Sequence, residues 1–167
     1  MTGVQTCALP ISADGGQFLV RDGGGRWWSI DAVQGRALAL PASVRDCCFL
    51  GSKVLQLRDG WYLDSDQAIL PASAQVFPTS TSALAVDGDK LYVLDAQGNT
   101  SSLSQLPGQG AVQVEKGDWP LVLRRGQHLS LVSQEGAVTS LPGRAGQVLA
   151  ASAKTAWTVN AERTQAQ

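Results

Sequence analysis

Few residues in this sequence are charged, and neither sign of charge predominates. Only 16% of the 167 residues are charged, below the usual ~25%, with 13 basic and 14 acidic residues for a net charge of −1. Such a balance gives no positive face for nucleic acid and no polybasic membrane anchor. No apolar run approaches the ~18 residues that span a bilayer. We therefore expect neither a nucleic-acid partner nor a transmembrane segment.

Helical periodicity is also missing. Apolar residues do not recur at i, i+3, i+4 and i+7, and glycine or proline interrupts every window of about 12 residues that a helix would need. The 18 glycines exceed the roughly 12 expected at average usage of ~7%. Together these features favour a turn-rich, all-β chain.

What the sequence does have is a repeat, marked by a Leu-Pro pair about every 30 to 36 residues. Each pair ends a unit that consists of a short apolar strand, a tight turn, an alternating strand, a second turn and a third strand. The Leu-Pro pairs begin at Leu40, Leu70, Leu106 and Leu141. Asp22-Gly23, Asp59-Gly60 and Asp87-Gly88 predict the first turn of three copies, because glycine accepts positive φ, and Arg125-Gly126 takes this place in the next copy.

Segments 44–50, 75–77 and 111–115 predict one further strand ahead of a copy. Four short antiparallel strands per repeat are typical of a β-propeller blade. We expect an all-β, propeller-like array of about four four-stranded blades and a partial fifth, part of a larger propeller. The predicted repeats occupy residues 13–160, at about 18–41, 44–71, 75–107, 111–142 and 147–160.

The two ends break the pattern. Residues 1–12, MTGVQTCALPIS, resemble translated sequencing-adaptor sequence and lack the charged start of a secretory signal. We expect them to be a non-native, disordered leader. Residues 161–167 read as a truncated tail, since the last repeat stops before its closing strand. Both ends predict a fragment of a longer protein.

Segment 87–99, DGDKLYVLDAQGN, resembles the repeat of bacterial propellers of the pyrroloquinoline-quinone (PQQ)-enzyme and YVTN type. The repeats of these propellers share, in order along the chain, an Asp-Gly pair, an aromatic residue, a Leu-Asp pair and a glycine. RWWSIDAVQG and WYLDSDQAIL match more loosely. The resemblance implies the blade, in a ring of six to eight, and a bacterial protein, with the envelope favoured over the cytoplasm. The tryptophan-docking motif of the quinone enzymes is absent, so we expect no cofactor.

Three carboxylates recur just after the middle strand of their repeats: Asp31, Asp64 and Asp95. They could form a ring that binds cations or a basic partner. We favour the interpretation that each caps its own turn through an Asx hydrogen bond, because Ser133 and Asn160 occupy the same position and also cap.

Cys47-Cys48 could form a strained vicinal disulfide or bind a soft metal. We favour two small buried hydrophobes, because metal sites need spaced pairs or a histidine and adjacent strand residues face opposite sides. The single histidine, His128, has no nucleophile motif nearby, and we expect it at a rim rather than as a catalytic base. We predict no catalytic residue and no metal site.

The tryptophans are the main apolar anchors, and most are expected to pack between blades. A tryptophan or tyrosine left at a rim would mark a contact patch. The candidate contact residues are Trp27, Trp28, Trp61, Tyr62, Trp119 and His128, and Trp157 is a further anchor.

The leading functional hypothesis is a non-catalytic binding or scaffold module, whose short loops contact another protein. One alternative is the propeller portion of a larger enzyme, a hydrolase or a quinone-type dehydrogenase, with catalytic residues outside this sequence. Another is a structural protein of the bacterial envelope or surface.

Overall fold

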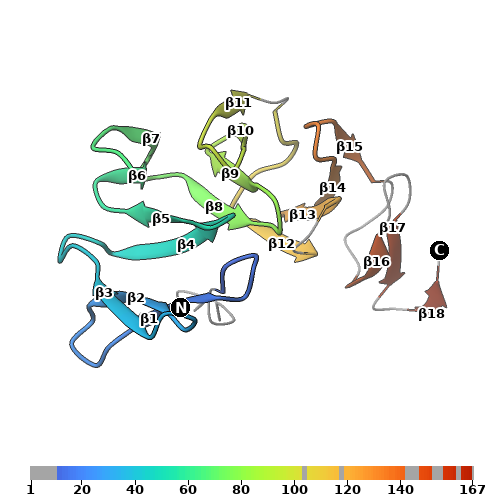
Figure 1. Ribbon diagram of the computed structural model, residues 1–167. Coiled ribbons are helices and arrows are strands. Elements are labelled where there is room, and N and C mark those ends of the chain that lie inside the picture. The colour runs from blue at the N-terminus through green and yellow to red at the C-terminus, as the bar shows by residue number, and fades with distance from the viewer. Residues whose placement is uncertain are drawn as a thin grey trace. The chain divides into compact units, whose positions relative to one another are not determined.

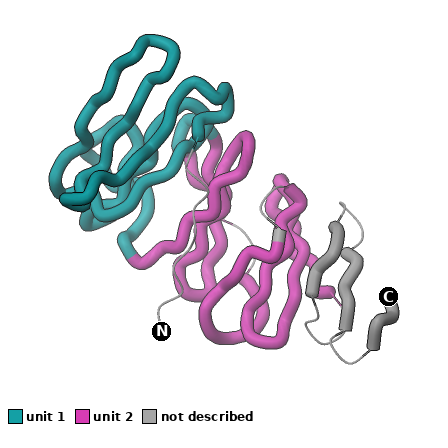
Figure 2. Tube along the Cα trace, turned by 90° about the horizontal axis from the view of Figure 1, so that it is seen from below, with its two compact units in different colours: residues 1–72, 96–98 teal, residues 73–95, 99–167 magenta. Residues whose placement is uncertain are grey.

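The computed structural model describes residues 11–102, 105–116, 119–141, 147–151, 156–160 and 163–166, and all of its regular structure is β (Figure 1). Side chains are described as far as Leu141, apart from Lys116. By contacts the chain divides into two compact units (Figure 2). Unit 1 is Met1–Ala72 with Ala96–Gly98, and unit 2 is Ser73–Asp95 with Asn99–Gln167.

Unit 1 contains two antiparallel meanders, one of three strands and one of four. The first is β1 (Gln17–Arg21), β2 (Trp27–Asp31) and β3 (Arg36–Ala39). The second is β4 (Asp46–Leu50), β5 (Lys53–Leu57), β6 (Gly60–Leu63) and β7 (Ala68–Pro71). Ile11 also bridges to Phe18 beside β1.

Unit 2 contains three antiparallel meanders, two of four strands and one of three. The first is β8 (Gln75–Pro78), β9 (Ala83–Asp87), β10 (Lys90–Leu94) and β11 (Thr100–Ser102). The second is β12 (Val112–Lys116), β13 (Leu121–Arg125), β14 (His128–Val132) and β15 (Val138–Ser140). The third is β16 (Gln147–Ala151), β17 (Ala156–Asn160) and β18 (Arg163–Ala166).

The predicted all-β fold of repeated blade-like meanders is confirmed. The strands expected at 44–50, 75–77 and 111–115 are β4, β8 and β12. In the described part of the chain, three of the five sheets have four strands, and the first and the last have three. Among the described residues, no helix is long and apolar enough to cross a membrane.

Three hairpins share one two-residue turn in which glycine comes first. Gly51, Gly88 and Gly126 have φ of 63°, 60° and 59°, and each turn joins directly paired strand ends. Glycine at the first central position of a two-residue hairpin is the arrangement of a type II′ turn. The sequence therefore predicted the turn glycine correctly at Gly88 and Gly126.

At the two other Asp-Gly pairs the turn glycine was predicted wrongly. In the β1–β2 turn the positive φ, 83°, belongs to Gly25 rather than to Gly23. Gly60 lies inside β6, where a Cβ atom would stand 2.8 Å from the Cβ of Ala68 and 3.1 Å from the carbonyl oxygen of Leu70. Glycine is required there for close approach to β7, a common reason for glycine within a strand.

Each unit has an apolar core between its sheets. In unit 1, Leu19 of β1 packs with Cys47 and Phe49 of β4. In unit 2, one cluster joins β8–β10 to the next sheet: Phe77, Leu84, Val86, Leu91, Leu106, Val112, Leu121, Leu123 and Val132. A separate cluster of Val122, Leu129 and Leu131 lies on the other face of β13–β14. Strands that are apolar on both faces suit a sheet covered on both sides.

Candidate functional site

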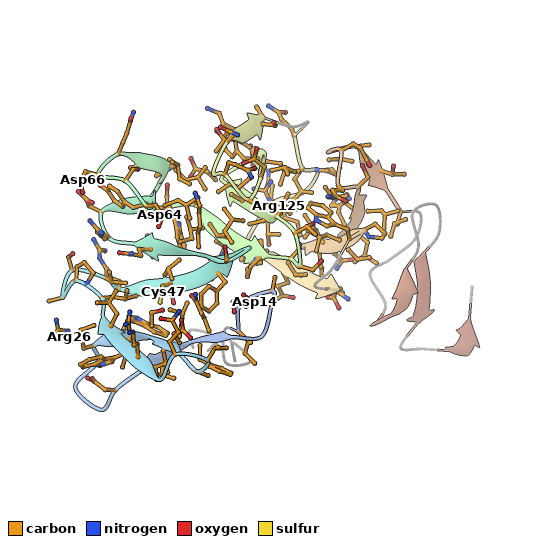
Figure 3. All side chains as sticks on the ribbon, in the orientation of Figure 1. Asp14, Arg26, Cys47, Asp64, Asp66 and Arg125 are labelled. Carbon is orange, nitrogen blue, oxygen red and sulfur yellow. The ribbon has the colours of Figure 1, made fainter. Side chains whose placement is uncertain are left out.

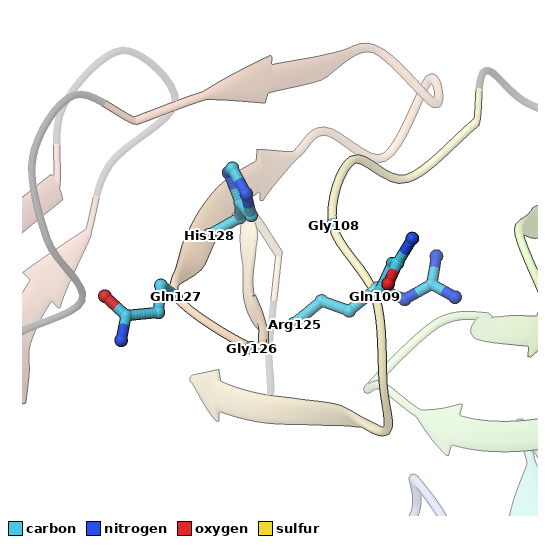
Figure 4. Close-up of a pocket in the computed structure, with 6 residues that line it drawn as sticks. All are labelled: Gly108, Gln109, Arg125, Gly126, Gln127 and His128. Atoms are coloured by element: carbon cyan, nitrogen blue, oxygen red, sulfur yellow. The ribbon is translucent and has the colours of Figure 1, made fainter.

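An open surface depression of about 530 Å³ lies in unit 2, beside the β13–β14 turn (Figure 4). We call it the loop hollow. One wall is the segment that leads from β11 to β12, and the other is the turn itself. Its lining residues are Gly108, Gln109, Arg125, Gly126, Gln127 and His128.

Arg125, at the end of β13, holds the wall of the loop hollow in place. Although arginine is almost never buried unless paired, its exposed fraction is only 7%. Its Nε donates to the carbonyl oxygen of Gly110 (3.1 Å) and its Nη1 to that of Leu106 (3.2 Å). Its Nη2 donates to Oδ1 of Asp89 in the β9–β10 turn, at 2.7 Å. One guanidinium therefore ties the loop and the turn of the preceding sheet to β13.

Gly108 lets this loop approach the hairpin closely. Its φ is +97°, and a Cβ atom built there would lie 2.8 Å from the carbonyl oxygen of Arg125 and 3.0 Å from Cδ2 of His128. Gly110 has a similar φ of +96°, but a Cβ atom there would meet nothing within 4 Å. Both the positive φ and the close contact therefore favour glycine at position 108, whereas only the positive φ favours it at position 110.

The side chains that the loop hollow offers to a ligand are amides and an imidazole. Gln109, Gln127 and His128 are exposed, and Figure 4 shows Gln127 and His128 projecting from the hairpin. The charge of Arg125 is balanced by Asp89. None of the six lining residues carries a carboxylate, a thiol or a hydroxyl. These groups can donate and accept hydrogen bonds, but they provide no activated nucleophile.

Of the residues that line the loop hollow, only His128 was predicted from the sequence as a candidate contact residue. The sequence feature that could have indicated this site is the arginine at position 125. It stands at a position where the preceding copy has Asp87, which is a reversal of charge within the repeat. That reversal places a guanidinium opposite Asp89 of the preceding hairpin. Gly108 and Gln109 follow a Leu-Pro pair, and the residues after these pairs are not similar from one copy of the repeat to the next.

The two candidate tryptophans of β2 bind their own neighbours within unit 1. Trp27 packs against the core, and its Nε1 donates to the carbonyl oxygen of Arg45 at 3.3 Å. Trp28 donates from Nε1 to Oδ2 of Asp22 at 2.9 Å. The guanidinium of Arg26 lies 5.6 Å from the centre of the Trp28 ring system, close enough for a cation–π contact.

The remaining candidates also lie outside the loop hollow. Trp61 is buried, with an exposed fraction of 5%. Tyr62 donates its hydroxyl to Oδ1 of Asp59 at 2.8 Å. Trp119 packs against the core of unit 2 and donates from Nε1 to Oγ of Ser82 at 2.8 Å. The side chain of Trp157 falls outside the described residues. Only His128 of the six candidate contact residues lines the loop hollow.

The capping interpretation holds for two of the three repeated carboxylates. Oδ1 of Asp31 accepts from the backbone N–H groups of Val33 and Gln34, at 3.0 and 2.9 Å. Oδ1 of Asp95 accepts from the N–H of Asn99 at 2.9 Å. Asp64 differs: it has a positive φ of 49°, and its carboxylate lies 3.6 Å from Nζ of Lys53.

The adjacent cysteines behave as thiols on opposite faces of β4. Cys47 is buried in the core of unit 1 and Cys48 is half-buried. The expectation of a small buried hydrophobe therefore describes Cys47 well and Cys48 in part. Among the described residues, no group of three or more His, Cys, Asp or Glu side chains could hold a metal ion.

Hydrogen bonds lower the pKa of Asp22, the acceptor for Trp28. The indole N–H of Trp28 contributes most, followed by the backbone N–H of Arg26. The folded state therefore favours the ionised carboxylate. This contribution to stability is present above the unfolded pKa, close to 3.8, and is lost as the pH falls through the lower folded value.

We expect Trp28→Phe to raise the pKa of Asp22 toward its ordinary value, because phenylalanine has no N–H to donate. An NMR titration of the side-chain carboxyl carbon measures this directly. Trp27→Phe is the matched control, since that indole donates to Arg45 instead. Equal pKa values for Asp22 in both variants would contradict the assigned cause.

The similarity of this chain to known proteins lies in structure and not in sequence. The sequence matches no protein-family model and no curated protein sequence. It is similar to a solved structure described as "Streptogramin B lyase structure", with a TM-score of 0.46 and 16% sequence identity. The similarity covers 90% of this chain and 61% of that chain, so this chain spans less than two thirds of that protein's length. The PQQ/YVTN type stays a prediction.

Proposed function

We propose that this chain is a non-catalytic β-propeller binding or scaffold module that contacts another protein at the loop hollow. One observation carries the proposal. Gln109, Gln127 and His128 are exposed together on a loop and a turn that the buried guanidinium of Arg125 fastens to each other.

Amide and imidazole groups match the hydrogen-bonding groups of a polypeptide, which offers one N–H donor and one C=O acceptor per residue. A loop already held in place loses less conformational freedom on binding, and this improves affinity. The hollow is open rather than enclosed, whereas small-molecule sites bury most of their ligand. A shallow polar surface on a rigid loop therefore suits a protein partner better than a small substrate.

Selection from a random peptide library against the purified chain tests this proposal. We expect selected peptides to bind with Kd on the order of 1–100 µM, measured by calorimetry. Combining Gln127→Ala with His128→Ala should weaken binding at least about tenfold, a loss of about 1.4 kcal/mol. Thr139→Ala, at an exposed position on β15, should leave binding unchanged. Equal affinities for all three proteins would show that the loop hollow is not the contact.

A further inference from the structure

A second and smaller depression, of about 250 Å³, lies in unit 1 and combines groups of both charges. We call it the mixed-charge hollow. Gln56 and Tyr62 are directly paired across β5 and β6, and the acidic residues follow in the turn after β6 (Figure 3). Its lining residues are Gln56, Arg58, Tyr62, Asp64, Ser65 and Asp66.

The guanidinium of Arg58 forms one side of this hollow, but its hydrogen bonding is incomplete. It lies 4.9 Å from the centre of the Tyr62 ring, and its Nη2 donates to Oε1 of Gln56 at 2.9 Å. Its Nε is buried and has no hydrogen-bond partner. A buried donor without a partner is costly. A movement of Arg58 that brings this buried N–H to a ligand oxygen in the hollow would therefore gain a hydrogen bond.

The other side of the hollow offers acceptors. Asp64 is partly neutralised by Lys53, 3.6 Å away, and Asp66 is exposed. Asp59, which accepts from the Tyr62 hydroxyl, adds a third carboxylate close by. The mixed-charge hollow thus places a guanidinium donor and carboxylate acceptors around one small space.

We propose that the mixed-charge hollow binds a neutral, polyhydroxylated ring, that is, a monosaccharide or one unit of a glycan. Arg58 and Lys53 offset two of the three negative charges of Asp59, Asp64 and Asp66, so the hollow holds both donors and acceptors with a net charge of about −1. Each hydroxyl group can both donate and accept, so a sugar donates to the carboxylates and accepts from the guanidinium. The space is partly open and lies below the roughly 300–1,000 Å³ of larger ligand sites, so it suits a single ring that stays partly exposed and binds weakly. This site is separate from the loop hollow and does not depend on the proposed function.

The Nε–H signal of Arg58 in a ¹H–¹⁵N NMR spectrum reports directly on this site. The probes are methyl α-glucoside, methyl α-mannoside and methyl β-galactoside, with sodium acetate and methylammonium chloride as charged probes. At least one glycoside should shift the signal saturably, with Kd on the order of 1–10 mM, and neither charged probe should. If no glycoside shifts it, or acetate or methylammonium does so instead, the proposal is wrong.

A pair of variants separates this site from a general effect of charge. Asp66→Ala removes an exposed carboxylate of the hollow and should weaken glycoside binding at least about fivefold. Glu135→Gln removes one negative charge in unit 2 and should leave the affinity unchanged. Full glycoside affinity in Asp66→Ala, or an equal loss in both variants, would overturn the proposal.

Discussion

Replacing Arg125 by methionine is expected to lower the free energy of unfolding by about 2–4 kcal/mol. Methionine keeps much of the aliphatic length of the side chain but cannot donate. The carbonyl oxygens of Leu106, which is buried, and of Gly110, which is exposed, both accept from the guanidinium and would lose this partner. Urea denaturation followed by tryptophan fluorescence measures the loss as a lower midpoint at an unchanged slope.

Asp89→Ala is the matched control, because it removes the charged partner and keeps the two carbonyl bonds. The Asp89 side chain is 68% exposed, and an ion pair with such a partner contributes about 0–1 kcal/mol. A small effect of Asp89→Ala beside a large effect of Arg125→Met would locate the stabilisation in the loop carbonyls. Equal losses in the two variants would instead assign it to the ion pair.

Replacing Gly108 by alanine is expected to lower the free energy of unfolding by about 2–4 kcal/mol, from two causes. Left-handed backbone costs a residue with a Cβ atom about 1–2 kcal/mol. The new Cβ would also stand 2.8 Å from the carbonyl oxygen of Arg125, so the backbone of the loop or of β13 has to move. The same urea experiment measures this loss, and amide NMR shifts at His128 would report the displacement.

Gly110→Ala separates these two causes within the same loop. Its φ of +96° is close to the +97° of Gly108, but its Cβ would meet no atom within 4 Å. It should therefore cost only about 1–2 kcal/mol, from the backbone alone, and leave the shifts at His128 unchanged. Equal costs for the two alanine variants would contradict the close approach of the loop to the β13–β14 turn.

Much of the fold could be predicted because strands and tight turns are set by neighbouring residues. The alternation in β10, where Leu91 is buried, and the glycine first in the turn at Gly88 are both visible within a few residues. Gly60 shows where such reasoning fails. Its Asp-Gly pair resembles a turn, but glycine is needed there because of Ala68 and Leu70, eight and ten residues away.

The loop hollow was harder to predict, because its residues meet only after the sheets have formed. Arg125 and Asp89 are 36 residues apart, and no local pattern links them. His128 was found because it is the single histidine, whereas Gln109 has no distinctive chemistry. Most tryptophans were expected to pack between blades, with one left at a rim as a contact residue. The structure adds that the indole N–H groups of Trp28 and Trp119 bind Asp22 and Ser82, and the contact role of the candidates stays a prediction.

The central claim is that each repeat folds into its own antiparallel meander and packs on the next meander within unit 2. Long-range NOEs test it most directly. We expect backbone NOEs for the strand pairs Tyr92–Ala85 and Leu131–Val122, together with methyl NOEs that join Leu84 and Leu91 to the cluster containing Leu121. Helical carbon shifts in these segments, or NOEs that pair β10 with β14, would contradict the account.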